Sequence, residues 1–104
     1  RDLVGGTVAY MAPEQLLDVK SRGNGGVDAR TDLYSLGVMA FEMLTGEVPF
    51  PGSFLSDTEG LLAARRKGPP SVRERNPAVG PAVEAIVRKL LAPDPKDRYQ
   101  TAED

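Results

Sequence analysis

The sequence lacks two residue types that carry much of protein chemistry. Its 104 residues include no cysteine, which excludes disulfides and thiolate metal sites. They include no histidine either, which removes the commonest general base and the commonest metal ligand. Any site that this chain builds must therefore use carboxylates, hydroxyls, lysine or arginine.

The chain also has neither a strong net charge nor a long apolar run. It carries 13 basic and 15 acidic residues, a balance that argues against nucleic-acid binding through bulk positive charge. Its longest apolar stretch, residues 33–44, is interrupted by Ser35 and Glu42 and is too short to cross a bilayer. No signal peptide and no initiator methionine opens the chain, so we expect a piece of a larger protein.

Local patterns predict an all-α chain without strands or repeats. Residues 1–12 and 69–80 are rich in glycine, proline or arginine and are predicted loops. The predicted helices run from Pro13 to about Val19, from a cap at Asp28 or Thr31 to Thr45, from a cap at Ser56 or Asp57 to Lys67, and from about Pro81 to residue 92, with a last one beginning at Thr101.

Two of these helices differ in how they should pack. The helix that ends at Thr45 is apolar on almost every side, which is typical of a helix buried inside a larger protein. The helix near Pro81 instead has a single apolar stripe with a favourable Glu84–Arg88 pair on its flank. That stripe consists of Val83, Ile86, Val87, Leu90 and Leu91.

Four motifs follow one another along the chain: G-T-V-A-Y-M-A-P-E at residues 6–14, D-L-Y-S-L-G at 32–37, E-M-L-T-G-E-V-P-F at 42–50 and D-P-K-D-R at 94–98. Together they resemble the C-terminal lobe of serine/threonine protein kinases, above all the bacterial eukaryotic-like branch. The resemblance covers essentially the whole chain. It implies that residues 1–104 are a partial kinase domain, an all-α fragment that forms the helical C-terminal lobe of the α+β protein kinase fold.

The resemblance implies transfer of the γ-phosphate of ATP to serine or threonine hydroxyls of protein substrates. ATP and Mg²⁺ would bind the full domain, because this chain has no Gly-rich loop, lysine–glutamate pair, catalytic aspartate or metal-ligand motif. We therefore expect the chain alone to be inactive, to bind no cofactor or metal, and to need an N-lobe and a catalytic loop as partners. The alternative is a pseudokinase or regulatory scaffold that binds proteins without phosphoryl transfer.

The same resemblance implies a cytoplasmic protein, or the cytoplasmic domain of a membrane-anchored receptor kinase. It also assigns supporting roles to two residues. Thr7 would hydrogen-bond the catalytic aspartate and a lysine of the catalytic loop, although a threonine beside Gly6 is also an ordinary loop residue. Asp32, predicted one turn inside the buried helix, would accept hydrogen bonds from the catalytic-loop backbone; helix capping or dipole compensation is its alternative.

Substrate contacts are implied for a second group of residues. Val8, Ala9 and Tyr10 would lie in the segment against which the substrate peptide rests. Tyr10 could equally be an aromatic anchor of this loop with its hydroxyl partnered. Glu42 is either a solvent-facing acid in the middle of a helix or a site for basic residues that precede the acceptor hydroxyl.

Glu14 and Arg98 are expected to form a buried ion pair. Glu14 lies in a short helix with little apolar surface of its own, and Arg98 lies in a turn stiffened by Pro93 and Pro95. In the kinase family the corresponding glutamate and arginine meet, so the resemblance implies this tether. Two unrelated surface charges are the alternative, each contributing well under about 1 kcal/mol.

Three remaining features have simpler interpretations or none. Cations cluster at residues 65–67, 73 and 75; we interpret them as a solvated helix end and loop, with a docking patch for acidic partners as the alternative. Leu3 occupies the place where many relatives of the family carry a phosphorylatable residue. Residues 23–26 form a glycine-rich insertion of unassigned role, which is no phosphate loop because no Lys-Ser/Thr follows it.

Overall fold

The computed structural model describes residues 8–21, 29–52 and 57–101. These residues form helices and connecting loops without a strand, as predicted for an all-α fragment. The elements are η1 (Val8–Tyr10), α1 (Pro13–Ser21), α2 (Ala29–Thr45), α3 (Thr58–Lys67), α4 (Val72–Arg75), α5 (Pro81–Leu90) and η2 (Pro95–Asp97).

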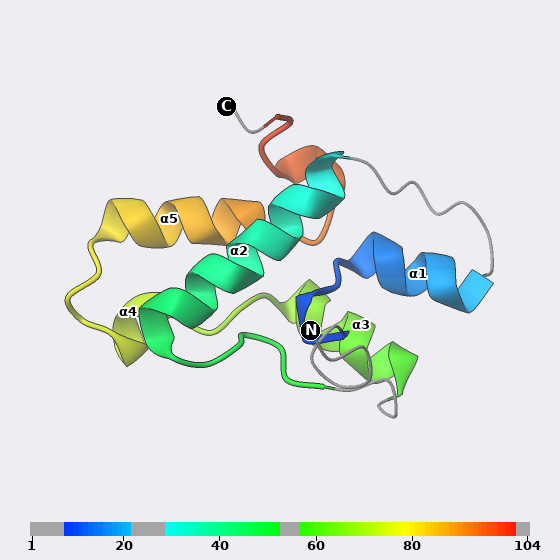
Figure 1. The fold of residues 1–104 in the computed structure, drawn as a ribbon, viewed down its shortest axis with the longest axis horizontal. Coiled ribbons are helices and arrows are strands. Elements are labelled where there is room, and N and C mark those ends of the chain that lie inside the picture. Colours follow the sequence, from blue (N-terminus) through cyan, green and yellow to red (C-terminus); the bar gives the residue numbers. More distant parts are fainter. Residues whose placement is uncertain (1–7, 22–28, 53–56, 102–104) are drawn as a thin grey trace.

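Helix α2 is the centre of the arrangement. It contacts η1, α4 and α5, whereas α1 packs against α3. Figure 1 shows α5 along one side of α2, with α1 and α3 on the other side. Because η1 joins α2 to the α1–α3 pair, residues 8–14 lie between the two parts of the molecule.

The core divides in the same way into two apolar clusters. The larger lies around the inner face of α2 and consists of Ala12, Tyr34, Val38, Phe41, Phe50, Val72, Val79, Val87 and Leu91. The smaller lies between η1, α1 and α3 and consists of Val8, Leu16, Leu61 and Leu62. Burial of these side chains supplies most of the driving force for the arrangement, at about 25 cal/mol per Å² of apolar surface removed from water.

A close approach between α2 and α5 depends on Gly37. A Cβ atom at that position would lie 2.8 Å from Leu90 Cβ and 3.0 Å from Leu91 Cδ2. The missing side chain therefore lets the C-terminal end of α5 contact α2 closely. This crossing explains why only part of the predicted apolar stripe of α5 is covered. Leu90 is buried, whereas Val83 and Ile86, nearer the start of the helix, are exposed.

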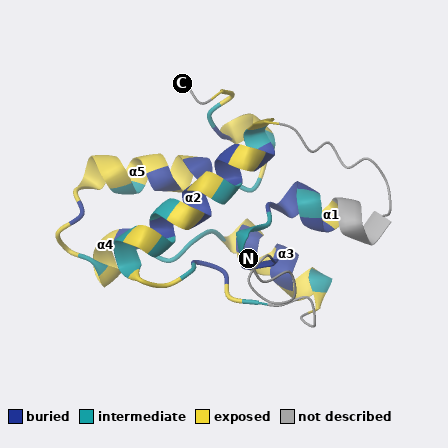
Figure 2. Ribbon diagram, in the orientation of Figure 1, coloured by how far each residue is buried: buried dark blue, intermediate teal, exposed yellow. Residues whose placement is uncertain are grey.

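Helix α2 is apolar on almost every side, but the described residues cover only one face of it. Leu33 and Phe41 are buried, while Leu36 and Met43 are 50% and 85% exposed. Figure 2 shows exposed positions along α2 in yellow beside the buried ones. In this chain Asp32 is exposed, between the buried Thr31 and Leu33, so the described residues do not supply the burial expected for it inside a larger protein.

Several local predictions need correction. Residues 8–10 form a 3₁₀ turn instead of an extended loop, and α1 continues to Ser21. The predicted loop 69–80 contains the short helix α4, because the Ser71 side chain accepts a hydrogen bond from the Glu74 amide at 3.2 Å. A serine followed three residues later by a glutamate is a helix-start signal that the proline-rich composition obscured.

The pairing expected for Glu84 also differs. Its carboxylate accepts hydrogen bonds from the Ser71 hydroxyl at 2.8 Å and from the Arg73 amide at 3.1 Å. The Arg73 amide and the Ser71 hydroxyl hold the pKa of Glu84 below its usual value, and Arg88 adds a smaller coulombic effect. Glu84 therefore fixes the start of α4 to α5 more than it pairs along its own helix.

Candidate functional site

The segment at residues 8–14 is the candidate site, because side chains from three distant parts of the chain hold it. Within it, Val8 and Ala9 are buried and Tyr10 is half-buried. The Met11 amide donates to the Val8 carbonyl at 3.1 Å, which closes the 3₁₀ turn. Val8 and Ala9 are thus largely covered by the chain itself.

Two of the predicted substrate contacts, Tyr10 and Glu42, meet each other. The Tyr10 hydroxyl donates a hydrogen bond to a carboxylate oxygen of Glu42 in the middle of α2. The Ser35 hydroxyl, also from α2, donates to the Tyr10 carbonyl at 3.0 Å. Tyr10 therefore has the partnered hydroxyl of an anchoring aromatic residue. Glu42 is half-buried instead of freely solvated, and its hydrogen-bond partner is a tyrosine.

Arg65 of α3 is the residue whose place the sequence interpretation missed. It was expected in a solvated helix end, but its side chain is fully buried. Nε donates to the Met11 carbonyl at 2.8 Å, and Nη2 donates to the Val8 carbonyl at 2.8 Å. Burial lowers the pKa of the guanidinium, and the neighbouring Tyr34 opposes that effect. Arg65 remains charged near neutral pH, because arginine does not deprotonate in proteins.

A periodic signal for this burial was present in the sequence. Arg65 follows Leu61 by four residues and Leu62 by three, so all three share one face of a helix. Both leucines are buried against α1 and η1. The exposed neighbours Arg66 and Lys67 are solvated as expected. Because Arg65 is followed by two further cations, the run suggested a solvated helix end, although Arg65 itself faces inward.

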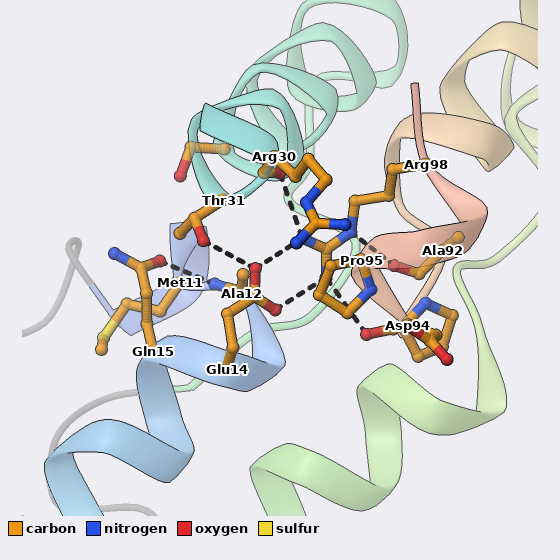
Figure 3. Close-up of polar contacts among 12 residues, drawn as sticks. Met11, Ala12, Glu14, Gln15, Arg30, Thr31, Ala92, Asp94, Pro95 and Arg98 are labelled. Carbon is orange, nitrogen blue, oxygen red and sulfur yellow. Dashed lines mark hydrogen bonds and ion pairs between the residues drawn. The ribbon is translucent and has the colours of Figure 1, made fainter. Parts of the chain in front are cut away.

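The other end of the segment is held by Arg98. Its Nη1 lies 2.6 Å from Glu14 Oε2 and its Nη2 lies 2.8 Å from Glu14 Oε1, which makes a two-point ion pair (Figure 3). The guanidinium is fully buried and Glu14 is nearly so. The pair joins residues 84 positions apart in the sequence.

The remaining donors and acceptors of this pair are also satisfied. Arg98 donates to three further carbonyls, those of Ala92 at 2.7 Å and of Arg30 and Pro93 at 3.1 Å each. All five of its N–H groups are thus engaged. The Thr31 hydroxyl donates to Glu14 Oε2 at 2.7 Å, so Thr31 links α2 to α1 instead of capping its helix. Burial works to raise the pKa of Glu14, but the Arg98 and Thr31 hydrogen bonds outweigh it, and the pKa lies below its usual value.

Aromatic rings connect the two buried arginines. The Arg98 Cζ atom lies 4.7 Å from the centre of the Tyr34 ring, and the Arg65 Cζ atom lies 5.2 Å from the centre of the Phe50 ring. The two rings stack with centres 6.4 Å apart and an interplanar angle of 18°. This series of cation–ring and ring–ring contacts connects the two arginines that hold residues 8–14.

Tyr34 carries an unusual feature within this stack. Its hydroxyl oxygen is buried and has no hydrogen-bond partner among the described residues. Burial is the largest influence on its pKa and raises it well above the ordinary value, so the hydroxyl stays neutral. A buried hydroxyl without a partner costs about 1–3 kcal/mol, so the ring contacts explain an aromatic residue at this position, while nothing among the described residues explains its hydroxyl.

Several predicted positions lie outside the described residues. They are Leu3, Thr7, Asp28, Ser56 and the glycine-rich insertion 23–26. Among the residues that the structure describes, no group of three or more acidic side chains is arranged to hold a metal ion. In the same ranges, no helix has the length and apolar character needed to cross a membrane.

Comparison with known proteins agrees with the motifs. The protein kinase domain model matches residues 2–104. The serine/threonine-protein kinase Pkn1 of Myxococcus xanthus is 42% identical over 97 residues, covering 93% of this chain and 13% of Pkn1. PrkC of Bacillus subtilis is 41% identical over 99 residues, covering 95% of this chain and 14% of PrkC.

A third relative gives the same result. PknB of Mycobacterium leprae is 41% identical over 97 residues, covering 93% of this chain and 14% of PknB. The chain thus spans about one seventh of the length of these curated relatives. All three are named as serine/threonine-protein kinases of bacteria. The chain therefore belongs to the protein kinase domain family, among the serine/threonine kinases of the bacterial eukaryotic-like kind.

Proposed function

We propose that this chain is the substrate-side part of the C-terminal lobe of a serine/threonine protein kinase, which transfers the γ-phosphate of ATP to protein hydroxyls. The observation that carries the proposal is the double attachment of residues 8–14 by Arg65 and Arg98. A surface that positions a peptide hydroxyl must be rigid, because a misplacement of 1 Å can cost about 100-fold in rate.

The catalytic groups for this reaction belong to other parts of the domain. ATP and Mg²⁺ supply the phosphoryl group and the charge that stabilises it, and the sequence has no motif for holding either. This chain contributes positioning. Thr7 would hydrogen-bond the catalytic aspartate and lysine, and Asp32, exposed at the first turn of α2, would accept hydrogen bonds from the catalytic-loop backbone.

The segment itself would support the acceptor peptide from below. Val8 and Ala9 form the buried base of the segment, and the hydrogen bond from the Tyr10 hydroxyl to Glu42 ties the segment to α2. Glu42 retains a second carboxylate oxygen that could meet a basic residue before the acceptor hydroxyl. The intact protein would be cytoplasmic, or would carry this lobe as the cytoplasmic domain of a receptor kinase.

The test uses the intact kinase with Thr7 replaced. Thr7→Ala should lower the turnover of a serine-containing substrate by on the order of tenfold, the effect of about 1.4 kcal/mol of lost transition-state alignment. Thr101→Ala, the same substitution at an exposed position near the other end of the chain, serves as the matched control. Phosphotyrosine as the main product, or an unchanged rate in Thr7→Ala, would contradict the proposal.

Two further observations separate this function from a scaffold. Incubation of the isolated chain with labelled ATP and Mg²⁺ should give no phosphate transfer above a buffer blank. The intact protein should carry the H-R-D and D-F-G aspartates upstream of residue 1. If those aspartates are replaced while protein binding persists, a pseudokinase scaffold is the correct assignment.

A further inference from the structure

The structure offers no carboxylate to the buried Arg65 within its described residues. Arg65 is fully buried and donates to three carbonyl oxygens, those of Val8, Leu61 and Met11, at 2.8–3.0 Å. Removing a charge from water is costly unless it is compensated, and carbonyl dipoles compensate it less well than an opposite charge does. Stability alone is therefore a weak reason for a buried guanidinium at this position, although removing it would leave the Val8 and Met11 carbonyls without this donor.

We propose that Arg65 is a positioning residue that sets the backbone shape of residues 8–11 and thereby the affinity of the kinase for its acceptor peptide. This inference rests on the proposed function, because it assumes that residues 8–11 support the peptide. It adds a specific group on α3 to that function, one that does not itself touch substrate.

The geometry of the guanidinium explains why arginine is suited to this role. Nε and Nη2 point along the same edge of the planar group, and this edge spans the carbonyls of Val8 and Met11 at 2.8 Å each. These two carbonyls lie at the two ends of the 3₁₀ turn. The Ser35 hydroxyl donates a hydrogen bond to the Tyr10 carbonyl, which lies between them in the sequence. Side chains from α2 and α3 therefore donate to three of the four carbonyls of residues 8–11, which leaves the backbone of these residues little freedom.

The guanidinium is itself held in place. Nη1 donates to the Leu61 carbonyl at 3.0 Å, one turn back in α3, and the Phe50 ring covers one face of the group. The planar guanidinium thus holds residues 8–11 in a fixed place relative to α3. A lysine at this position would keep the charge but offers a compact ammonium that cannot reproduce the planar two-point contact.

The experiment compares three variants of the intact kinase with the wild type. Arg65→Met removes the charge, and Arg65→Lys keeps it without the two-point contact. Arg66→Met is the matched control, because Arg66 is the adjacent exposed arginine. The probes are a fluorescein-labelled basic peptide with a single serine, whose Kd is followed by fluorescence anisotropy, and a fluorescent ATP analogue.

The proposal predicts a selective loss of peptide binding. Arg65→Met should raise the Kd of the peptide by roughly tenfold, Arg65→Lys by less, and Arg66→Met by less than twofold. The Kd of the ATP analogue should stay within twofold in all three. An unchanged peptide Kd in a folded Arg65 variant, or equal weakening of both ligands, would overturn the inference, because a merely structural role gives one of those results.

The remaining outcomes are also decisive. If Arg65→Met does not fold, the peptide Kd of the folded Arg65→Lys variant, compared with its Kd for the ATP analogue, tests the inference. If neither folds, Arg65 acts on the stability of the whole lobe and the inference is wrong. Wild-type protein that binds the peptide without phosphorylating it would overturn the proposed kinase function alone, and the Kd comparison would still test Arg65. Wild-type protein that neither binds nor phosphorylates the peptide would overturn both.

Discussion

The positive charges of the two buried arginines are compensated in different ways for their removal from water. Arg98 meets the Glu14 carboxylate at two points and fills its other donors with three carbonyls. Arg65 is equally buried, but the described residues give it carbonyls and an aromatic face in place of a carboxylate. One guanidinium is thus part of a closed ion pair, and the other is a positive charge held by dipoles.

The difference indicates that the two arginines have different roles at the two ends of residues 8–14. The ion pair at Glu14 locks the start of α1 to the turn at residues 92–98, far away in the sequence. The contacts of Arg65 shape the backbone of η1, where the peptide is proposed to rest. Breaking an ion pair strands a charge, whereas removing Arg65 strands only carbonyl groups, so the two attachments should fail by different amounts.

The largest effect is expected from breaking the ion pair. Glu14→Gln or Arg98→Met in the intact protein should each reduce the free energy of unfolding by about 3–5 kcal/mol, because each leaves one buried charge unpaired. The double variant should be less destabilised than the sum of the two. Urea unfolding followed by circular dichroism measures all three, and single-variant losses below about 1 kcal/mol would mean that the pair adds little.

Removal of Arg65 should have a smaller effect on stability. Arg65→Met should reduce the free energy of unfolding by about 1–3 kcal/mol, because the Val8 and Met11 carbonyls lose a donor but no charge is stranded. Arg66→Met, at the exposed neighbour, should change it by less than about 0.5 kcal/mol. The same urea titration serves. A loss of unfolding free energy as large as that of Arg98→Met would show that the two arginines do not differ in the way described.

Acid should affect the two attachments differently. The pKa of Glu14 is lowered in the folded protein, so the unfolded chain takes up the proton more readily. The stability that Glu14 contributes is therefore complete above its unfolded pKa of about 4.3 and is lost as the pH falls through its lower folded value. The contacts of Arg65 do not titrate in this range.

The urea midpoints of unfolding, measured from pH 7 down to pH 3, test this difference. The wild type should lose stability below about pH 4 more steeply than Glu14→Gln, which has no carboxylate to protonate. Arg65→Met should follow the same steep profile as the wild type. Parallel curves for the wild type and Glu14→Gln would show that Glu14 is not the group responsible.

The smallest effect is expected at the ring between the two arginines. Tyr34→Phe keeps the stack with Phe50 and the contact with Arg98, and it removes a hydroxyl that has no partner among the described residues. The free energy of unfolding should change by less than about 1 kcal/mol, and toward greater stability. A loss above about 2 kcal/mol would instead reveal a partner for this hydroxyl elsewhere in the intact protein.

Local signals in the sequence predicted the helices well, because caps and breakers act over a few residues. The ends of α2 at Thr45 and of α3 at Lys67 agree with the glycines that follow them, and Asp57, one of the two predicted caps, caps α3. The same signals failed at α4, where a capping serine lay within a proline-rich stretch. They also left η1 as a loop, because its turn depends on contacts from α2 and α3.

The sequence by itself determined the helical class and, through its four motifs, the kinase family. It also led to the Glu14–Arg98 contact, although through family resemblance and not through any local pattern. Only the tertiary structure decided which cation of the run at residues 65–67 is buried, and that Tyr10 and Glu42 meet. The physical reason is that burial depends on how α3 packs against α1 and η1, and these elements are separated by more than 35 residues of chain.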